Sequence, residues 1–527
     1  MSQVLKNDRS LQGSHFTVAE VIKTSPHPTL LWFSFPSVLR SFFLSLVLKR
    51  RAKVKDRINA LPDALLCHIL SFLPTKYAVR TTILSRRWKN LWTSVPNLYF
   101  NDRKDFPSFQ AGPYGSNLFT RFVDRVLYFR DSSDIKKFRL SVTYTDDLSH
   151  VDGWLCTAIR RNVVELDFEL CQSHYNQYRE FELPQSLFTC RTLTVLKLSS
   201  NCITYAPPTS GCFPSLKFLY VTVHYPDTDS IEKLISCCSI LENLNIDGIL
   251  RCDVVSNIHI SVPTLKTLSI NLSVDPQYHD YNLLINGPKL ENIDFKQDLS
   301  SNYSLEHSKS LVKANIVLKE VPCRVVALLE AISNVKYLSL SAERLKEWYL
   351  PVFPNLSQLK VVLYDSCYWE MLVMLLRKTP NLEDLILEDR TICQRDYSKL
   401  RWNPPKFLLV YLRSHLKTIT IRGFKGREIE REVSKYLLEN AKILKKMRIY
   451  TSLVHITEKE LYKEFLMFQR GSVTCQVEFI KIIFCAPTEL SNESSNIENA
   501  MPYTLHLENE LYKEDSDVPK GFNDLSS

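Results

Sequence analysis

The chain has 527 residues and a formal net charge of +9, from 66 Lys and Arg against 57 Asp and Glu. This length exceeds one ordinary globular core, so we expect several domains or a repeat array. The basic and acidic residues are intermixed, and so small an excess does not by itself predict a nucleic-acid-binding patch.

The 14 cysteines are scattered, and no C-x-x-C pair occurs among them. This pattern favours free thiols in a reducing compartment over a disulfide framework or a zinc site. Glycine is rare, and there is no Walker-type or dinucleotide-binding loop, no H-E-x-x-H and no G-x-S-x-G motif. We therefore expect no metal, no cofactor and no enzyme active site.

The first segment, residues 1–55, holds a hydrophobic run at 30–48 and a basic cluster at 49–55. The run approaches the length of a membrane-spanning helix, about 20 residues. Pro36 and Arg40 lie in its middle and are costly in lipid, so a membrane anchor is possible but not favoured. A cleaved signal peptide fits poorly because the run starts late. The basic cluster also has the composition of a nuclear-import signal.

Residues 56–100 have the pattern of three short helices. The first opens after Leu61-Pro62 and ends at Pro74, and Thr75 is expected to cap the second. Apolar residues recur at helical spacing in three sets: Leu65, Ile69, Phe72 and Leu73; Val79 and Ile83; Leu84, Trp88, Leu91 and Trp92. So small a unit cannot bury all of them, which leaves apolar surface for a partner.

The order of Leu61-Pro62-Asp63, Leu73-Pro74 and Leu84-Ser85-Arg86-Arg87-Trp88, followed by Leu91-Trp92, resembles an F-box. The resemblance implies docking on a Skp-type adaptor and, through it, on a cullin of a RING ubiquitin ligase. The residues that we expect to contact the adaptor or support that surface are Leu61, Pro62, Leu65, Ile69, Leu84, Trp88, Leu91 and Trp92. The simpler alternative is a helical subdomain that only covers the next domain.

After a linker with the first repeat turns at 101–160, one pattern recurs through 161–400: apolar, two variable residues, apolar, one variable residue, apolar. Leu193-Leu196-Leu198 and Leu241-Leu244-Ile246 are examples. The spacing, mostly about 21 to 26 residues, falls in the range of leucine-rich repeats. The pattern resembles the repeats of F-box proteins, but Asn201 alone holds the repeat's asparagine position, so we expect an irregular array.

Each repeat should contribute one short strand with alternate side chains pointing into a shared core, and a helical or irregular return leg. Helical return legs are predicted at 230–236 and 369–377. Outward-pointing strand residues are the candidate contacts for a protein partner, and they include Lys197, Tyr220, Asn245, Ser269 and Lys360.

The segment 401–484 begins at Trp402-Asn403-Pro404-Pro405. We predict strands at 414–424, around 444–449 and at 472–484, with helices at 427–441 and 457–469. The segment resembles the FBD domain of plant F-box proteins in Ser414-His415-Leu416-Lys417, Gly423-Phe424, Glu430 and residues 435–441 with 444–447. Physically it would close the open end of the array. Residues 485–527 have the composition of a disordered acidic tail.

The predicted fold class is α/β: an N-terminal helical F-box, then an irregular leucine-rich-repeat solenoid closed by a C-terminal FBD module. The predicted function is substrate recognition for a Skp–cullin–F-box ubiquitin ligase in the cytoplasm, the nucleus or both, with an unknown protein as the target. The alternative is a repeat-based interaction scaffold, with or without membrane attachment, that has no ligase role.

Overall fold

The computed structural model describes residues 58–481 except 106–112, 132, 144–147, 171–180, 201–202, 205–211, 224–227, 251–255, 275–276, 278–280, 298–301, 307, 319–324, 343–348, 364–368, 391–409 and 452–457. Several sequence features lie outside the described residues: the hydrophobic run at 30–48, the basic cluster at 49–55, Asn201, the segment 402–405 and the tail 485–527. Their predicted roles stay predictions.

The N-terminal unit consists of short helices: α4 (Asp63–Leu70), α5 (Thr75–Arg80) and the 3₁₀ turns η3 (Thr81–Ile83), η4 (Arg87–Lys89) and η5 (Leu91–Ser94). The first two predicted helices are confirmed, but the third is a series of 3₁₀ turns. Trp88 of η4 and Leu91 of η5, two turns that meet at Asn90, both enter the unit's core.

The predicted cap of α5 at Thr75 is wrong. Pro74 holds the N-cap position, where no side chain caps the helix. The Thr75 hydroxyl is buried and accepts a hydrogen bond from the Tyr99 amide at 2.7 Å. The hydroxyl therefore joins the helical unit to the strand that follows it.

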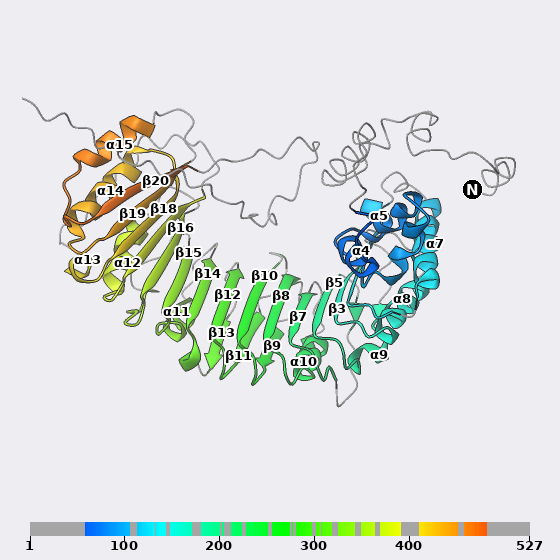
Figure 1. Ribbon diagram of the computed structural model, residues 1–527. Helices are drawn as coiled ribbons and strands as arrows, with labels where there is room; N and C mark the ends of the chain where they lie inside the picture. The colour runs from blue at the N-terminus through cyan, green and yellow to red at the C-terminus, as the bar shows by residue number, and fades with distance from the viewer. Residues whose placement is uncertain are drawn as a thin grey trace, which may run out of the picture. The chain divides into compact units, whose positions relative to one another are not determined.

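A 15-stranded parallel sheet runs through the rest of the described chain (Figure 1). Within this sheet the strands follow one another in the order in which they occur along the chain, although short strands of other sheets lie between some of them in the sequence. The strands are β1 (Asn97–Asn101), β2 (Lys137–Val142), β3 (Glu165–Leu170), β5 (Val195–Ser200), β7 (Phe218–Val223), β8 (Asn243–Leu250), β10 (Thr267–Val274), β12 (Asn292–Gln297), β14 (Lys313–Leu318), β15 (Tyr337–Ala342), β16 (Gln358–Leu363), β17 (Asp384–Asp389), β18 (Thr418–Phe424), β19 (Lys446–Thr451) and β20 (Gln476–Lys481).

The strand register stacks equivalent apolar residues of successive repeats. One column, continuous from strand to strand, contains Leu166, Leu196, Leu219, Leu244, Leu268, Ile293, Ala314, Leu338, Leu359 and Leu385. These residues and Leu193 belong to a single buried cluster. The predicted repeat array with one shared core is confirmed, and it extends at both ends beyond 161–400.

The return legs are partly helical, as predicted, at α10 (Thr228–Ser236) and α12 (Trp369–Lys378), and also at α8 (Ser149–Arg160), α9 (Gln185–Phe188) and α11 (Val325–Ala331). Three return legs are instead the strands β9 (Ser256–Ser261), β11 (Tyr281–Asn286) and β13 (Asn302–Glu306), which form a second parallel sheet. They contact the helical legs beside them, β9 with α10 and β13 with α11. The remaining elements are α6 (Asp102–Asp105), α7 (Pro113–Phe129), β4 (Phe181–Glu182), β6 (Ile203–Thr204), η7 (Ser308–Ser310) and α13 (Val410–Ser414).

The last described turns carry the elements predicted for the C-terminal segment. β18, β19 and β20 continue the main sheet, with α14 (Glu428–Asn440) and α15 (Glu458–Met467) between them (Figure 1). α14 buries Val433, Leu437 and Leu438 and α15 buries Leu461 and Phe465, all within the same core cluster as the repeats.

Candidate interaction surfaces

The N-terminal unit has a core of its own, formed by Leu66, Leu70, Ala78, Trp88, Leu91 and Val95. Helix α4 is apolar on two sides, and the side that faces this core carries Leu66 and Leu70. A neighbouring side, about 100° around the helix, carries Leu65 and Ile69, which remain 49% and 46% exposed. Helix α4 therefore presents an apolar surface that the unit itself does not cover.

We define the apolar ridge as Leu65, Ile69 and Phe72, and note Ile83 as a further exposed apolar residue of the unit. Phe72, just beyond the end of α4, is 74% exposed, and Ile83 in η3 is 64% exposed. The His68 ring packs edge-on against Phe72 with ring centroids 5.0 Å apart, which helps to hold that exposed ring. Isolated exposed apolar residues are ordinary, but several large ones on so small a unit indicate an interaction site.

The predicted adaptor-binding residues fall into two groups. Leu65, Ile69 and Pro62 are exposed, whereas Trp88 and Leu91 are buried and Leu61, Leu84 and Trp92 are partly buried against the core. The buried residues can only support the surface, because they have almost no accessible area for a partner. Phe72 and Ile83 were part of the predicted helical pattern but not of the predicted site.

Arg87 ties the segment before α4 to the 3₁₀ turns. Its guanidinium donates to the carbonyl oxygens of Asn59 and Leu61 and, through Nε at 2.9 Å, to the Asp63 carboxylate. The neighbouring Trp88 Nε1–H donates to the Asn59 side-chain oxygen at 2.7 Å. These bonds fix the start of α4 and, with it, the orientation of the apolar ridge.

Polar contacts attach the N-terminal unit to the first strands. The Lys76 ammonium donates to the Asp105 carbonyl oxygen, and burial lowers the pKa of Lys76. Asn97 donates to the Ser71 carbonyl at 3.3 Å, and Arg130 to the Val95 carbonyl at 2.5 Å. Trp92 packs against both cores. The unit is therefore docked on the sheet and is not a tethered appendage.

The second surface is the open face of the main sheet, where the alternate strand residues that do not enter the core point outward. The register places all five candidate contacts, Lys197, Tyr220, Asn245, Ser269 and Lys360, in one transverse row. Their position on a common face agrees with the prediction, and their contact with a partner stays a prediction.

Side chains on this face are linked across strands. The Tyr220 hydroxyl donates to Asp247 at 3.2 Å, and Asn271 donates to the same carboxylate at 2.8 Å. Burial and the Asp247 charge raise the pKa of Tyr220 to about 12, so it stays a neutral donor near pH 7. Similar cross-strand pairs join Arg139 to Asp167 at 3.2 Å and Lys360 to Glu388 at 2.5 Å. The face is thus a polar surface with fixed donors and acceptors.

In the part of the chain that the structure describes, no helix is long and apolar enough to cross a membrane. No group of His, Cys, Asp or Glu in the same residues has an arrangement that could hold a metal ion.

Comparison with known families identifies two domains in this chain. An F-box domain model matches residues 58–100, which is the N-terminal helical unit with its first strand. A second family model, described as the LRR domain of At1g61320/AtMIF1, matches residues 126–508.

Similar proteins from Arabidopsis thaliana have F-box in their names, together with FBD, LRR-repeat or both. F-box/LRR-repeat protein 13 is 32% identical over 459 residues, which cover 81% of this chain and 97% of that protein. The probable FBD-associated F-box protein At1g32375 is 32% identical over 435 residues, covering 80% of this chain and 100% of that protein. The F-box/FBD/LRR-repeat protein At1g78750 is 32% identical over 453 residues, covering 80% and 96%.

Proposed function

The chain belongs to the plant F-box/FBD/leucine-rich-repeat family, and from that premise we propose that it is the substrate-recognition subunit of a Skp–cullin–F-box ubiquitin ligase. The F-box docks on a Skp-type adaptor, and the repeats recruit a protein target. The other subunits supply the ligase chemistry, so this chain is an adaptor and not an enzyme. We place the complex in the cytoplasm, the nucleus or both.

The apolar ridge is the observation that supports adaptor binding most directly. Leu65 and Ile69 lie on a side of α4 that the unit's own core leaves exposed. Apolar anchors of this kind dominate the binding energy of protein interfaces, and each costs about 2 kcal/mol or more on truncation. Trp88 and Leu91 act from the core by holding α4 in place.

The open face of the sheet is the proposed site for the target. A repeat array offers a long row of outward strand positions, and its partner is selected by the side chains in that row. The cross-strand bonds of Tyr220 and Asp247 hold these side chains in fixed orientations before a partner arrives, which reduces the entropy lost on binding.

The C-terminal turns are proposed to close the array, which is the physical role that we assign to the FBD segment. α14 and α15 cover the end of the shared core with Leu437, Leu438, Leu461 and Phe465. A terminal repeat is needed because an uncovered end would expose both core residues and an unpaired strand.

Direct binding to a plant Skp-type adaptor tests the first step. We expect the double variant Leu65→Asp with Ile69→Asp to bind at least about thirtyfold more weakly, because two anchors are replaced by charges. The matched control is Leu466→Asp on α15, a site with similar exposure, 52%, that lies outside the F-box. Calorimetric titration of each purified full-length variant gives the affinity, and circular dichroism verifies folding.

Wild-type affinity in the folded double variant would refute this assignment of the surface. If the wild-type chain itself does not bind any Skp-type adaptor, the ligase role is wrong and the scaffold alternative replaces it. The target is sought by proximity labelling under proteasome inhibition, comparing the wild type with an F-box-deleted form. A true target accumulates ubiquitin conjugates only with the wild type.

A further inference from the structure

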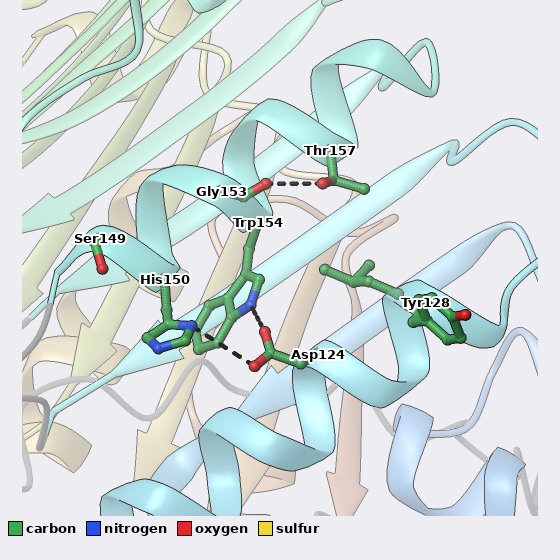
Figure 2. Close-up of a pocket in the computed structure, with 8 residues that line it drawn as sticks. Asp124, Tyr128, Ser149, His150, Gly153, Trp154 and Thr157 are labelled. Carbon is green, nitrogen blue, oxygen red and sulfur yellow. Dashed lines mark hydrogen bonds and ion pairs between the residues drawn. The ribbon is translucent and has the colours of Figure 1, made fainter.

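A pocket of about 370 Å³ lies between α7 and α8, and no residue of the apolar ridge or of the strand row lines it. Its lining residues are Asp124, Leu127, Tyr128, Ser149, His150, Gly153, Trp154 and Thr157. Figure 2 shows Asp124 on one helix pointing toward His150 and Trp154 on the other. The pocket is therefore a recess that contains the Asp124 carboxylate and is bordered by aromatic side chains.

The Asp124 carboxylate has unused capacity to accept hydrogen bonds. One oxygen, Oδ1, accepts from Trp154 Nε1 at 2.7 Å. The other, Oδ2, lies 3.6 Å from His150 Nδ1, which is too long for a good hydrogen bond. Among the described residues, no Lys or Arg forms an ion pair with Asp124. The negative charge is held in place by the indole N–H, and no Lys or Arg of the described residues neutralises it.

Aromatic rings border this carboxylate. The His150 and Trp154 ring centroids are 6.1 Å apart, and Trp154 is almost fully buried, which fixes that wall. Tyr128 lies at the rim with 81% of its surface exposed, and Figure 2 shows its hydroxyl directed away from Asp124. An exposed tyrosine face near a carboxylate is a favourable environment for a cation.

Gly153 is the least expected residue of the pocket. It lies inside α8, where glycine destabilises a helix by roughly 0.5–1 kcal/mol relative to alanine. A Cβ added there would meet no atom within 4 Å, so close packing does not require the glycine. A longer side chain at this position would instead fill the pocket, because Gly153 is one of its lining residues.

We propose that the pocket between α7 and α8 binds an arginine side chain of a partner protein. A guanidinium fits this site in two ways. Its N–H groups can donate to Asp124 Oδ2, and its planar face can stack on the ring of Tyr128. A carboxylate disfavours anionic ligands, and a neutral side chain would leave its charge uncompensated. The proposal does not depend on the F-box, because none of these residues belongs to it.

The test uses two short peptides, acetyl-Gly-Ser-Arg-Ser-Gly-amide and the same peptide with citrulline, the neutral analogue, in place of arginine. Ligand-observed NMR with the full-length protein measures their dissociation constants. We expect saturable binding of the arginine peptide and at least tenfold weaker binding of the citrulline peptide. A charge-assisted hydrogen bond is worth a factor of roughly ten to a hundred.

Three variants localise the site. Asp124→Asn keeps an oxygen that can accept from the Trp154 N–H but removes the charge. It should raise the dissociation constant of the arginine peptide at least tenfold. Gly153→Leu should abolish binding by filling the pocket. Asp152→Asn removes the same charge from an exposed position on α8 outside the lining and should leave the dissociation constant unchanged. Circular dichroism verifies that each variant is folded.

Equal affinity for the arginine and citrulline peptides would overturn the proposal, as would a folded Asp124→Asn variant with wild-type affinity. The absence of saturable binding to the wild type would do the same. If Asp152→Asn lowered the affinity for the arginine peptide as much as Asp124→Asn does, the overall negative charge of the protein and not the pocket would attract the peptide. That result would also contradict the proposal.

Discussion

At Gly248 the chain adopts a backbone that only glycine tolerates well. Its φ is +144°, and a Cβ there would lie 1.9 Å from the carbonyl oxygen of Val223, its partner on the neighbouring strand. Two adjacent strands meet here too closely for any side chain. Gly153 is the opposite case, since it lies in a helix with open space around it.

The two glycines make a matched pair for one substitution. Gly248→Ala should destabilise the protein by about 1–3 kcal/mol or more, because strain adds to a backbone clash. Gly153→Ala should be neutral or stabilise it by roughly 0.5–1 kcal/mol, since alanine favours the helix. Urea unfolding followed by circular dichroism measures both. Similar midpoints for the two variants would contradict the close approach at Gly248.

Glu430, in the first turn of α14, is a buried acid. One carboxylate oxygen, Oε2, accepts from the Lys425 amide at 3.0 Å and the Arg427 amide at 2.9 Å. The other, Oε1, has no hydrogen-bond partner in the described structure. Burial, and the charge of Asp389 nearby, raise the pKa of Glu430 to about 7, although Arg427 and the two amides oppose this.

This raised pKa predicts a pH dependence of stability. The folded state binds the proton more tightly than the unfolded state, so the contribution is complete below about pH 4.5 and is lost as the pH rises to about 7. The upper limit is on the order of 3 kcal/mol. Glu430→Gln should remove this dependence, and its stability relative to the wild type should increase from pH 4.5 to 7. Urea midpoints at several pH values measure that difference, and a constant difference would refute the assignment.

Within one strand, neighbouring residues have unequal structural roles. Leu268 of β10 is buried in the column, whereas Ser269 points to the open face. Leu268→Ala should destabilise the protein by about 2–5 kcal/mol, because it removes packing atoms and leaves a cavity between repeats. Ser269→Ala should change stability by less than about 0.5 kcal/mol. Urea unfolding compares them, and a small effect of Leu268→Ala would argue against a shared core.

Helix α15 allows a test of closure at the C-terminal end. Phe465 is buried, and its ring lies 6.0 Å from Phe424 and 5.3 Å from Phe479, measured between centroids. Phe465→Ala should lower the free energy of unfolding by about 3–5 kcal/mol. It should also promote aggregation, because α15 would no longer hold the last strands of the sheet in place. Met467→Ala, on the same helix but 87% exposed, is the control. Light scattering on heating detects the aggregation, and equal behaviour of both variants would refute closure by α15.

The strands and their stacking could be predicted from the sequence because the apolar positions of each repeat are the positions that are buried in the core. At Leu193-Leu196-Leu198 and its equivalents, each apolar position is a core position in every turn. The second sheet could not be predicted as easily. The alternating residues of β9, β11 and β13 carry a two-residue period, but these strands occupy return legs where helices or irregular turns were expected.

The exposed surface of the F-box unit could be predicted only in part, because α4 is apolar on two sides. The helical spacing used to predict α4 followed Leu65 and Ile69 and left out Leu66 and Leu70, and periodicity alone does not say which side meets the core. That choice depends on the 3₁₀ turns, which bring Trp88 and Leu91 against Leu66 and Leu70. Short 3₁₀ turns leave no distinct signal in the sequence.

In the molecule as a whole, the F-box and the repeats have cores of very different size. Among the described residues, the F-box core has six buried apolar side chains, while the repeats share one continuous cluster. Small cores open at lower free energy. We expect amides of α4 and α5 to exchange with solvent faster than those of β5–β17 in hydrogen-exchange mass spectrometry. An adaptor that binds the apolar ridge should slow that exchange, and uniform protection without adaptor would contradict the expected hierarchy.

The agreement between strand order and chain order has a consequence for biosynthesis. A parallel strand can pair only when its partner exists, and each new strand of the main sheet pairs with the strand of that same sheet that was translated before it. The growing chain can therefore add one strand at a time as it leaves the ribosome, starting from β1 beside the finished F-box. No strand has to wait for a distant part of the polypeptide, so even a sheet of this width can assemble without long exposure of its pairing edge.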